Sequence, residues 1–86
     1  MNGEIVWLDT AEADLEKLDH SLAERVIDRV EWIAENLGVI RLHALHGQFD
    51  GLFKLRVGDW RVVFHVERPR NIVTVHFVRH RSDVYE

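Results

Sequence analysis

Three cationic side chains with regular spacing, Lys54, Arg56 and Arg61, are the residues of this chain best suited to chemistry. The dipeptide Gly58-Asp59 separates two runs of β-branched and aromatic residues, which is a strong signal for a tight hairpin. Because side chains of a strand alternate between its two faces, all three cations are expected on one face. Neighbouring cations repel one another, so this face is predicted to bind an anion.

The opposite face of the same hairpin is apolar. Its first strand contributes Phe53, Leu55 and Val57, and its second strand contributes Trp60, Val62, Phe64 and Val66. Burial of this face leaves the cations on the other side of the sheet.

Length and composition place the chain among ordinary globular domains. It has 86 residues, of which 47% are hydrophobic and 30% are charged, so one domain is expected. The absence of cysteine excludes a disulfide framework and a thiolate zinc site. No apolar run approaches the roughly 20 residues of a membrane span, and the N-terminus lacks a signal-peptide pattern. A soluble cytoplasmic protein without a membrane partner is therefore expected.

The formal charge of −4 is unevenly distributed. Residues 1–38 hold ten acids and three bases, a net of −7, whereas residues 39–86 hold five acids and eight bases, a net of +3. Five of the six histidines also lie in the second part. Since local potential decides what a surface attracts, a nucleic-acid partner stays compatible with the acidic total.

The first part of the chain predicts one strand and two helices. Residues 4–8 read as a strand, and Asp9 or Thr10 is expected to cap the first helix. A second capping box begins at Ser21, and Gly38 is a natural C-terminal cap for the second helix. The apolar stripe of that helix is expected to consist of Leu22, Val26, Val30, Ile33 and Leu37.

The second part predicts three long strands. A connection over residues 39–50 leads to the hairpin, Pro69 marks a turn over residues 68–71, and residues 72–78 form the last strand. The order βααβββ predicts an α+β fold, with a helical hairpin on one face of a mostly antiparallel four-stranded sheet. The other face is expected to be open, and the strand order is left undetermined.

Three motifs indicate a family. Leu45-x-Gly47, the alternating string from Gly51 to Phe64 and the terminal His80-Arg81-x-x-Val84-Tyr85 together resemble the RelE/ParE superfamily of type II toxin–antitoxin toxins. With the strand and two helices at its start, the resemblance spans nearly the whole chain and implies a RelE-like fold. Some members cut messenger RNA in the ribosomal A site without metal, and others poison DNA gyrase.

The resemblance to the ribonuclease branch implies roles for individual residues. Lys54 matches the base that acts on the ribose 2′-hydroxyl, and Arg56 and Arg61 match the groups that hold the phosphate. Arg79 or Arg81 matches the arginine that assists the leaving 5′-oxygen, because the alignment can slip by two residues.

The same resemblance assigns Tyr85 to positioning or stacking of the nucleotide, and His65 and His80 are additional candidates for RNA contacts. Trp60 stands where tyrosine is more common, and Arg79 stands where glycine is frequent.

Elementary chemistry agrees with these roles. Lysine is a poor base at its ordinary pKa of about 10.4, and neighbouring arginines lower that pKa. Arginine stays protonated and binds phosphate in a bidentate manner, so it suits charge stabilisation. By strict alternation Arg79 follows Val75 and Phe77 toward the core, so the last strand has to end, bulge or twist to bring it to the site.

Each candidate has a simpler structural interpretation. The cations are also compatible with a solvated sheet face, and Tyr85 with packing of the C-terminus. His43 and His46, with His76 or His80, have a spacing that suits metal, but no carboxylate or cysteine completes the set. The tryptophans read as packing residues, with Trp32 a candidate for a partner interface.

The sequence therefore predicts a ribosome-dependent endoribonuclease that needs no metal or cofactor. Its expected partners are a cognate antitoxin and messenger RNA in the ribosomal A site, with DNA contacted only through the antitoxin complex. Two alternatives remain: a ParE-like toxin that inhibits DNA gyrase by binding, and an inactive member that only binds its antitoxin.

Overall fold

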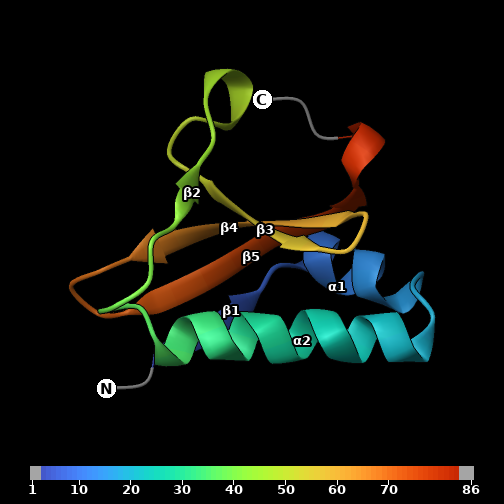
Figure 1. Ribbon diagram of the computed structural model, residues 1–86, viewed down its shortest axis with the longest axis horizontal. Helices are drawn as coiled ribbons and strands as arrows, with labels where there is room; N and C mark the ends of the chain where they lie inside the picture. Colours follow the sequence, from blue (N-terminus) through green and yellow to red (C-terminus); the bar gives the residue numbers. More distant parts are fainter. Residues whose placement is uncertain (1–2, 84–86) are drawn as a thin grey trace.

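The computed structural model describes residues 3–83, which form two helices and a five-stranded sheet (Figure 1). The strands are β1 (Glu4–Trp7), β2 (His43–Ala44), β3 (Phe53–Val57), β4 (Trp60–Glu67) and β5 (Ile72–His80). The helices are α1 (Asp9–Glu16) and α2 (His20–Glu35), and two short 3₁₀ turns are η1 (Gly47–Phe49) and η2 (Arg81–Asp83). The predicted α+β class is confirmed.

The strands lie in the order β1-β5-β4-β3-β2, with β1 parallel to β5 and the other pairs antiparallel. The prediction of four strands was wrong by one, because β2 pairs with β3 through His43–Lys54 and Ala44–Phe53. Two residues are too few to show an alternating pattern, so no pattern in the sequence indicates this edge strand. Within residues 3–83, no helix is long and apolar enough to cross a bilayer.

The main core lies between α2 and the sheet. Val26, Val30 and Ile33 of α2 are buried in one cluster with Val62 and Phe64 of β4. The predicted stripe is confirmed within α2, where Leu22 is half-buried at its start, whereas Leu37 is buried but lies beyond the end of the helix. The hydrophobic helix face therefore fixes α2 beneath the sheet.

The helix starts differ from the prediction. Leu8 occupies the N-cap of α1 and makes no side-chain cap bond, so neither Asp9 nor Thr10 is the cap. Thr10 instead donates a hydrogen bond to the carbonyl of His76. At α2 the Asp19 carboxylate accepts from the Leu22 N–H at 2.7 Å, so Asp19 rather than Ser21 is the cap. The helix ends at Glu35 with Asn36 as its C-cap, before Gly38.

The Asp19 cap leads to a stability prediction. Asp19→Ala removes the only side-chain acceptor at this helix start and is expected to lower the free energy of unfolding by about 0.5–2 kcal/mol. Ser21→Ala removes the N-cap residue that the sequence predicted, and it is expected to change the free energy of unfolding little. Urea unfolding followed by circular dichroism measures both, and equal losses would contradict the assignment.

The sheet face away from the helices is only partly open. Val63 points to that face and is 0% exposed, and Leu45 is 1% exposed, although both lie outside the main core cluster. The Phe49 ring lies 5.6 Å from the Phe77 ring, so the segment before β3 covers part of the sheet. The prediction of an open face was wrong for the part of the sheet that this segment covers.

A β-bulge interrupts the pairing of β4 with β5. Val63 is opposite Phe77 and Phe64 is opposite Val75, so His76 is an additional residue in β5. The extra residue reverses the alternation of side chains beyond it. Arg79 is thereby placed opposite Arg61 rather than in the core. Of the three irregularities that the sequence left open, an end, a bulge or a twist, the structure contains the bulge.

Candidate functional site

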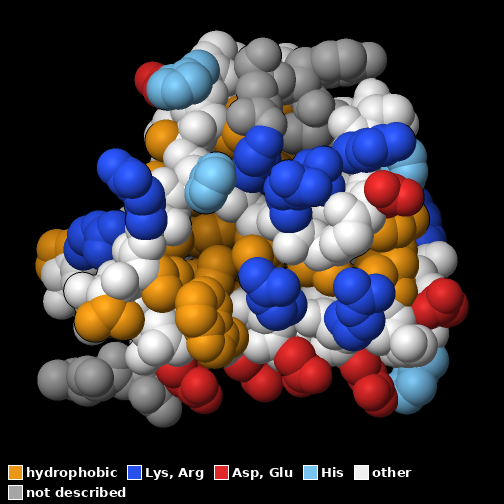
Figure 2. Space-filling model, in the orientation of Figure 1, with side chains coloured by type: hydrophobic (Ala, Val, Ile, Leu, Met, Phe, Trp, Pro, Cys, Tyr) orange, Lys and Arg blue, Asp and Glu red, His pale blue; other side chains and the backbone are white. Residues whose placement is uncertain are grey.

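Three arginines form one row across neighbouring strands. Arg56 of β3 is opposite Arg61 of β4, which is opposite Arg79 of β5. Adjacent strands lie about 4.8 Å apart, so the three side chains begin close together on one face. Lys54 lies two residues before Arg56 on the same side of β3, and we call these four residues the cation face. Figure 2 shows several Lys and Arg side chains gathered over the sheet.

Lys54 is half-buried within this group. Its partial burial, followed by the positive charges of Arg61 and Arg56, lowers the pKa of Lys54 below its usual value. Each cause disfavours the ammonium form. An anion bound at the cation face would favour the ammonium form and oppose the shift.

Arg56 and Arg61 differ in how their guanidinium groups are held. Nη1 of Arg61 donates to the carbonyl oxygens of Gly58 at 3.1 Å and Trp60 at 3.0 Å, which anchors the side chain at the hairpin turn. Gly58 has a φ of +60° and Asp59 a negative φ, as in a type II′ turn. Arg56 is exposed, and within residues 3–83 no carboxylate forms an ion pair with either arginine.

Arg79 lies at the rim of the cation face. Its guanidinium lies 4.5 Å over the Phe77 ring, and its Nε is 3.8 Å from a carboxylate oxygen of Asp14. The same oxygen accepts a hydrogen bond from the Val78 N–H at 2.9 Å, which fixes the acid against β5. Because the arginine side chain is 47% exposed, this long ion pair holds it weakly.

Arg81 belongs to the end of the sheet rather than to this row. It begins η2, its N–H donates to the carbonyl of Asp59 at 2.8 Å, and its Nε is 3.9 Å from the Asp59 carboxylate. Of the two arginines that the alignment left open, the structure brings Arg79 next to Arg61. Tyr85 lies outside the described residues.

The two histidine candidates lie apart from the four cations. His65 is exposed on the same face, but it is four residues beyond Arg61 on β4, about 13 Å along the strand. His80 is opposite Trp60, and their rings meet edge-on at 5.5 Å. Since Trp60 packs against the core, His80 lies on the helix side of the sheet. Within residues 3–83, no cluster of three or more His, Cys, Asp or Glu side chains is arranged to hold a metal ion.

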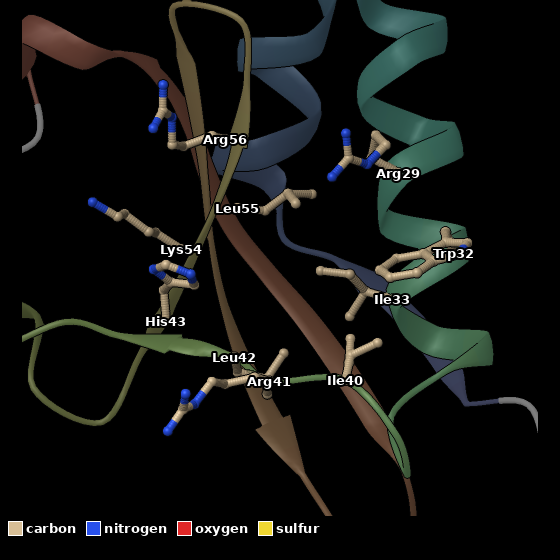
Figure 3. A pocket seen from close by; sticks show the side chains of 10 residues that line it. All are labelled: Arg29, Trp32, Ile33, Ile40, Arg41, Leu42, His43, Lys54, Leu55 and Arg56. Atoms are coloured by element: carbon tan, nitrogen blue, oxygen red, sulfur yellow. The ribbon is translucent and has the colours of Figure 1, made fainter.

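A groove that the sequence did not predict lies between α2 and the edge of the sheet. It has a volume of about 380 Å³, and Figure 3 shows the ten residues that line it. Trp32 and Ile33 of α2 face Leu55 of β3 across the groove, and Arg29 lies beside them (Figure 3). Trp32 is 47% exposed, which is high for a tryptophan with a packing role only. Trp32 lies outside the apolar stripe of α2, and this large apolar side chain on another face was the one signal of the groove in the sequence.

The edge of β3 beside this groove has backbone groups without a partner strand. The Leu52 carbonyl accepts a hydrogen bond from the Leu45 N–H, so the backbone polar groups of Leu52 point toward β2. Every second residue of a strand directs these groups to the same side, so those of Lys54 and Arg56 point the same way. β2 pairs only with Phe53 and Lys54. Among the described residues, no strand therefore pairs with Arg56 on that side, and the edge can accept an additional strand.

Comparison with known proteins identifies the family. The sequence profile of the ParE toxin of the type II toxin–antitoxin system, parDE, matches residues 5–85. No curated protein matches the chain in sequence.

Solved structures share the fold across almost the whole chain. The toxin–antitoxin complex RelBE2 from Mycobacterium tuberculosis matches with a TM-score of 0.80 and 25% identity, covering 96% of this chain and 95% of that chain. A double arginine-to-alanine variant of the free E. coli toxin RelE matches with a TM-score of 0.79 and 19% identity, covering 96% and 87%. The archaeal RelE–RelB complex from Pyrococcus horikoshii matches with a TM-score of 0.76 and 18% identity, covering 98% and 100%.

The match of the family profile over residues 5–85 and the shared βααββββ architecture lead to one conclusion. The chain belongs to the ParE toxin family of type II toxin–antitoxin systems, within the RelE/ParE superfamily.

Proposed function

We propose that this toxin is a ribosome-dependent endoribonuclease that cuts messenger RNA in the A site without a metal or cofactor. The observation that carries the proposal is the row Arg56–Arg61–Arg79 with Lys54 beside it. Four cations on one sheet face match the charge of an RNA backbone and of a phosphate that gains charge as it is attacked. The proposal places the protein in the cytoplasm, where ribosomes are.

Within this proposal each residue has a role. Lys54 accepts the proton of the 2′-hydroxyl, and its lowered pKa supports that role because the amine loses its proton more easily. Arg56 and Arg61 bind the phosphate oxygens, and Arg79 stabilises the leaving 5′-oxygen. Tyr85 stacks on the nucleotide.

Expression of the chain without a partner tests the proposal. Mapping the ends of ribosome-bound messenger RNA after induction is expected to show new 5′ ends at the A-site codon, together with arrest of translation. A ParE-like inhibitor of DNA gyrase would instead inhibit supercoiling by purified gyrase and cause DNA damage, with intact messenger RNA. An inactive member would cause neither effect.

We also propose that a cognate antitoxin binds along the free edge of β3. A strand added there would alternate its side chains between the groove on the helix side and the cation face on the other. The groove offers apolar contacts from Trp32, Ile33 and Leu55, whereas the other side offers Lys54 and Arg56. The segment that fits therefore alternates apolar and acidic residues, and DNA is contacted only through the antitoxin.

Trp32 gives this partner proposal a measurable prediction. Trp32→Ala removes the largest exposed apolar side chain of the groove and is expected to weaken antitoxin binding by about 2 kcal/mol or more, roughly 30-fold. Val39→Ala is the matched control, because Val39 is 84% exposed and does not line the groove. Calorimetric titration with the purified antitoxin measures both, and equal affinities would refute this docking site.

A further inference from the structure

His43 of β2 is directly opposite Lys54 of β3. Residues opposite each other in an antiparallel pair share one face of the sheet, with Cβ atoms about 4.5–5.5 Å apart. His43 therefore lies on the cation face, next to Lys54. Figure 3 agrees, since the two side chains leave neighbouring strands toward the same side, away from α2. The short strand β2 thus adds an imidazole to the site.

Among residues 3–83, the charged residues that line the groove with His43 are all basic. Lys54 and Arg56 face it from β3, Arg41 belongs to its own segment, and Arg29 of α2 lies across the groove. The residues that line the groove include no carboxylate. His43 is exposed, so a bound RNA can reach the ring. No acid in this lining holds the imidazole proton in an ion pair.

Histidine is the side chain that ordinarily exchanges a proton between about pH 5 and pH 8, whereas lysine is ordinarily protonated there. We propose that His43 is a second proton acceptor for the 2′-hydroxyl, acting beside Lys54 and serving the reaction near neutral pH. This inference rests on the proposed ribonuclease function. Under this inference the imidazole contacts the ribose directly, and the arginine row contacts the phosphate.

The step is balanced without a further reactant. The 2′-O–H bond breaks and its proton moves to a ring nitrogen of His43, while the 2′-oxygen forms a bond to phosphorus. The bond from phosphorus to the 5′-oxygen then breaks, and that oxygen takes a proton from water. The products are a 2′,3′-cyclic phosphate and a 5′-hydroxyl, and the imidazolium returns its proton to solvent.

The two acceptors are expected to act in different pH ranges. As pH rises, Lys54 loses its proton and takes over, at a lower pH than an ordinary lysine because its pKa is lowered. His43→Gln is therefore expected to slow cleavage by about 10²-fold at pH 7 and by progressively less toward pH 9. Lys54→Arg keeps the charge and removes the second acceptor, so it is expected to lose the rise in rate at alkaline pH.

Single-turnover cleavage on ribosomes programmed with a defined messenger RNA, between pH 6.5 and pH 9, tests the inference. His46→Gln is the control, because His46 is an exposed histidine of the same connection that does not pair with β3. A His43→Gln effect that shrinks with rising pH supports the inference. A rate ratio to wild type that is constant across pH, or no loss, overturns it while the ribonuclease function stands. Absence of cleavage by the wild type overturns the ribonuclease proposal itself.

Discussion

Replacing Lys54 and Arg61 together by alanine is expected to lower the rate of messenger RNA cleavage on purified ribosomes by at least about 10²–10³-fold. In the proposed mechanism the change removes the amine that accepts the 2′-hydroxyl proton, and with it the central arginine of the row Arg56–Arg61–Arg79. Proton transfer to Lys54 and the charge of Arg61 on the attacked phosphate both belong to the transition state of the proposed reaction, so their loss is expected to raise the barrier more than it weakens binding. Expression of the variant is accordingly expected to leave translation intact.

The matched control removes the same amount of charge elsewhere. Lys17 is exposed at the end of α1, and Arg70 is exposed in the turn before β5, where it pairs with Glu67. Lys17→Ala with Arg70→Ala is expected to retain cleavage, because neither residue belongs to the cation face. If the Lys54 and Arg61 double variant cut messenger RNA as fast as this control, the cation face would have no catalytic role.

Phe64→Ala is expected to have the largest effect on stability, a loss of about 3–5 kcal/mol in the free energy of unfolding. Phe64 is 1% exposed, and its ring packs 6.0 Å from that of Phe53 within the core that joins α2 to the sheet. Truncation leaves a cavity that the rigid strands on either side do not fill. The loss is a large share of the roughly 5–15 kcal/mol typical of a whole domain.

Phe49→Ala makes the same chemical change outside the main core. Phe49 is half-buried over Phe77, so its loss is expected to cost less than half as much. Urea unfolding gives both values, and Phe64→Leu supplies a milder variant should the alanine variant fail to fold. A Phe49→Ala loss equal to that of Phe64→Ala would show that the contact of Phe49 with Phe77 stabilises the fold as much as the main core does.

Local patterns in the sequence predicted the parts of the site that depend on neighbouring residues. The alternation around Lys54 and Arg56 fixed their common face, and Gly58 fixed the turn that brings Arg61 beside them. These features depend on a hairpin, whose two strands are adjacent in the chain, so a short window of sequence contains the information.

The remaining features depend on contacts that are distant in the chain. The bulge at His76 arises from the register of β4 against β5, which residue spacing within β5 does not reveal. The position of His43 beside Lys54 follows from pairing of a two-residue strand, and the groove beside Trp32 follows from the packing of α2 next to the edge of the sheet. Each needs the assembled tertiary structure.

Among residues 3–83, the separation of acidic and basic residues in space gives the molecule an electric dipole. The exposed acids of α2 (Glu24, Asp28, Glu31 and Glu35) lie on the helix layer, and the arginine row lies on the far side of the sheet. In Figure 2 most red atoms lie along the lower edge of the molecule, and most blue atoms lie above them. Near a polyanion this dipole produces a torque that turns the cation face toward the polyanion, although the net charge of −4 repels the molecule as a whole. Correct orientation on arrival should therefore depend on ionic strength, and productive encounters should become rarer as salt shortens the Debye length below about 8 Å.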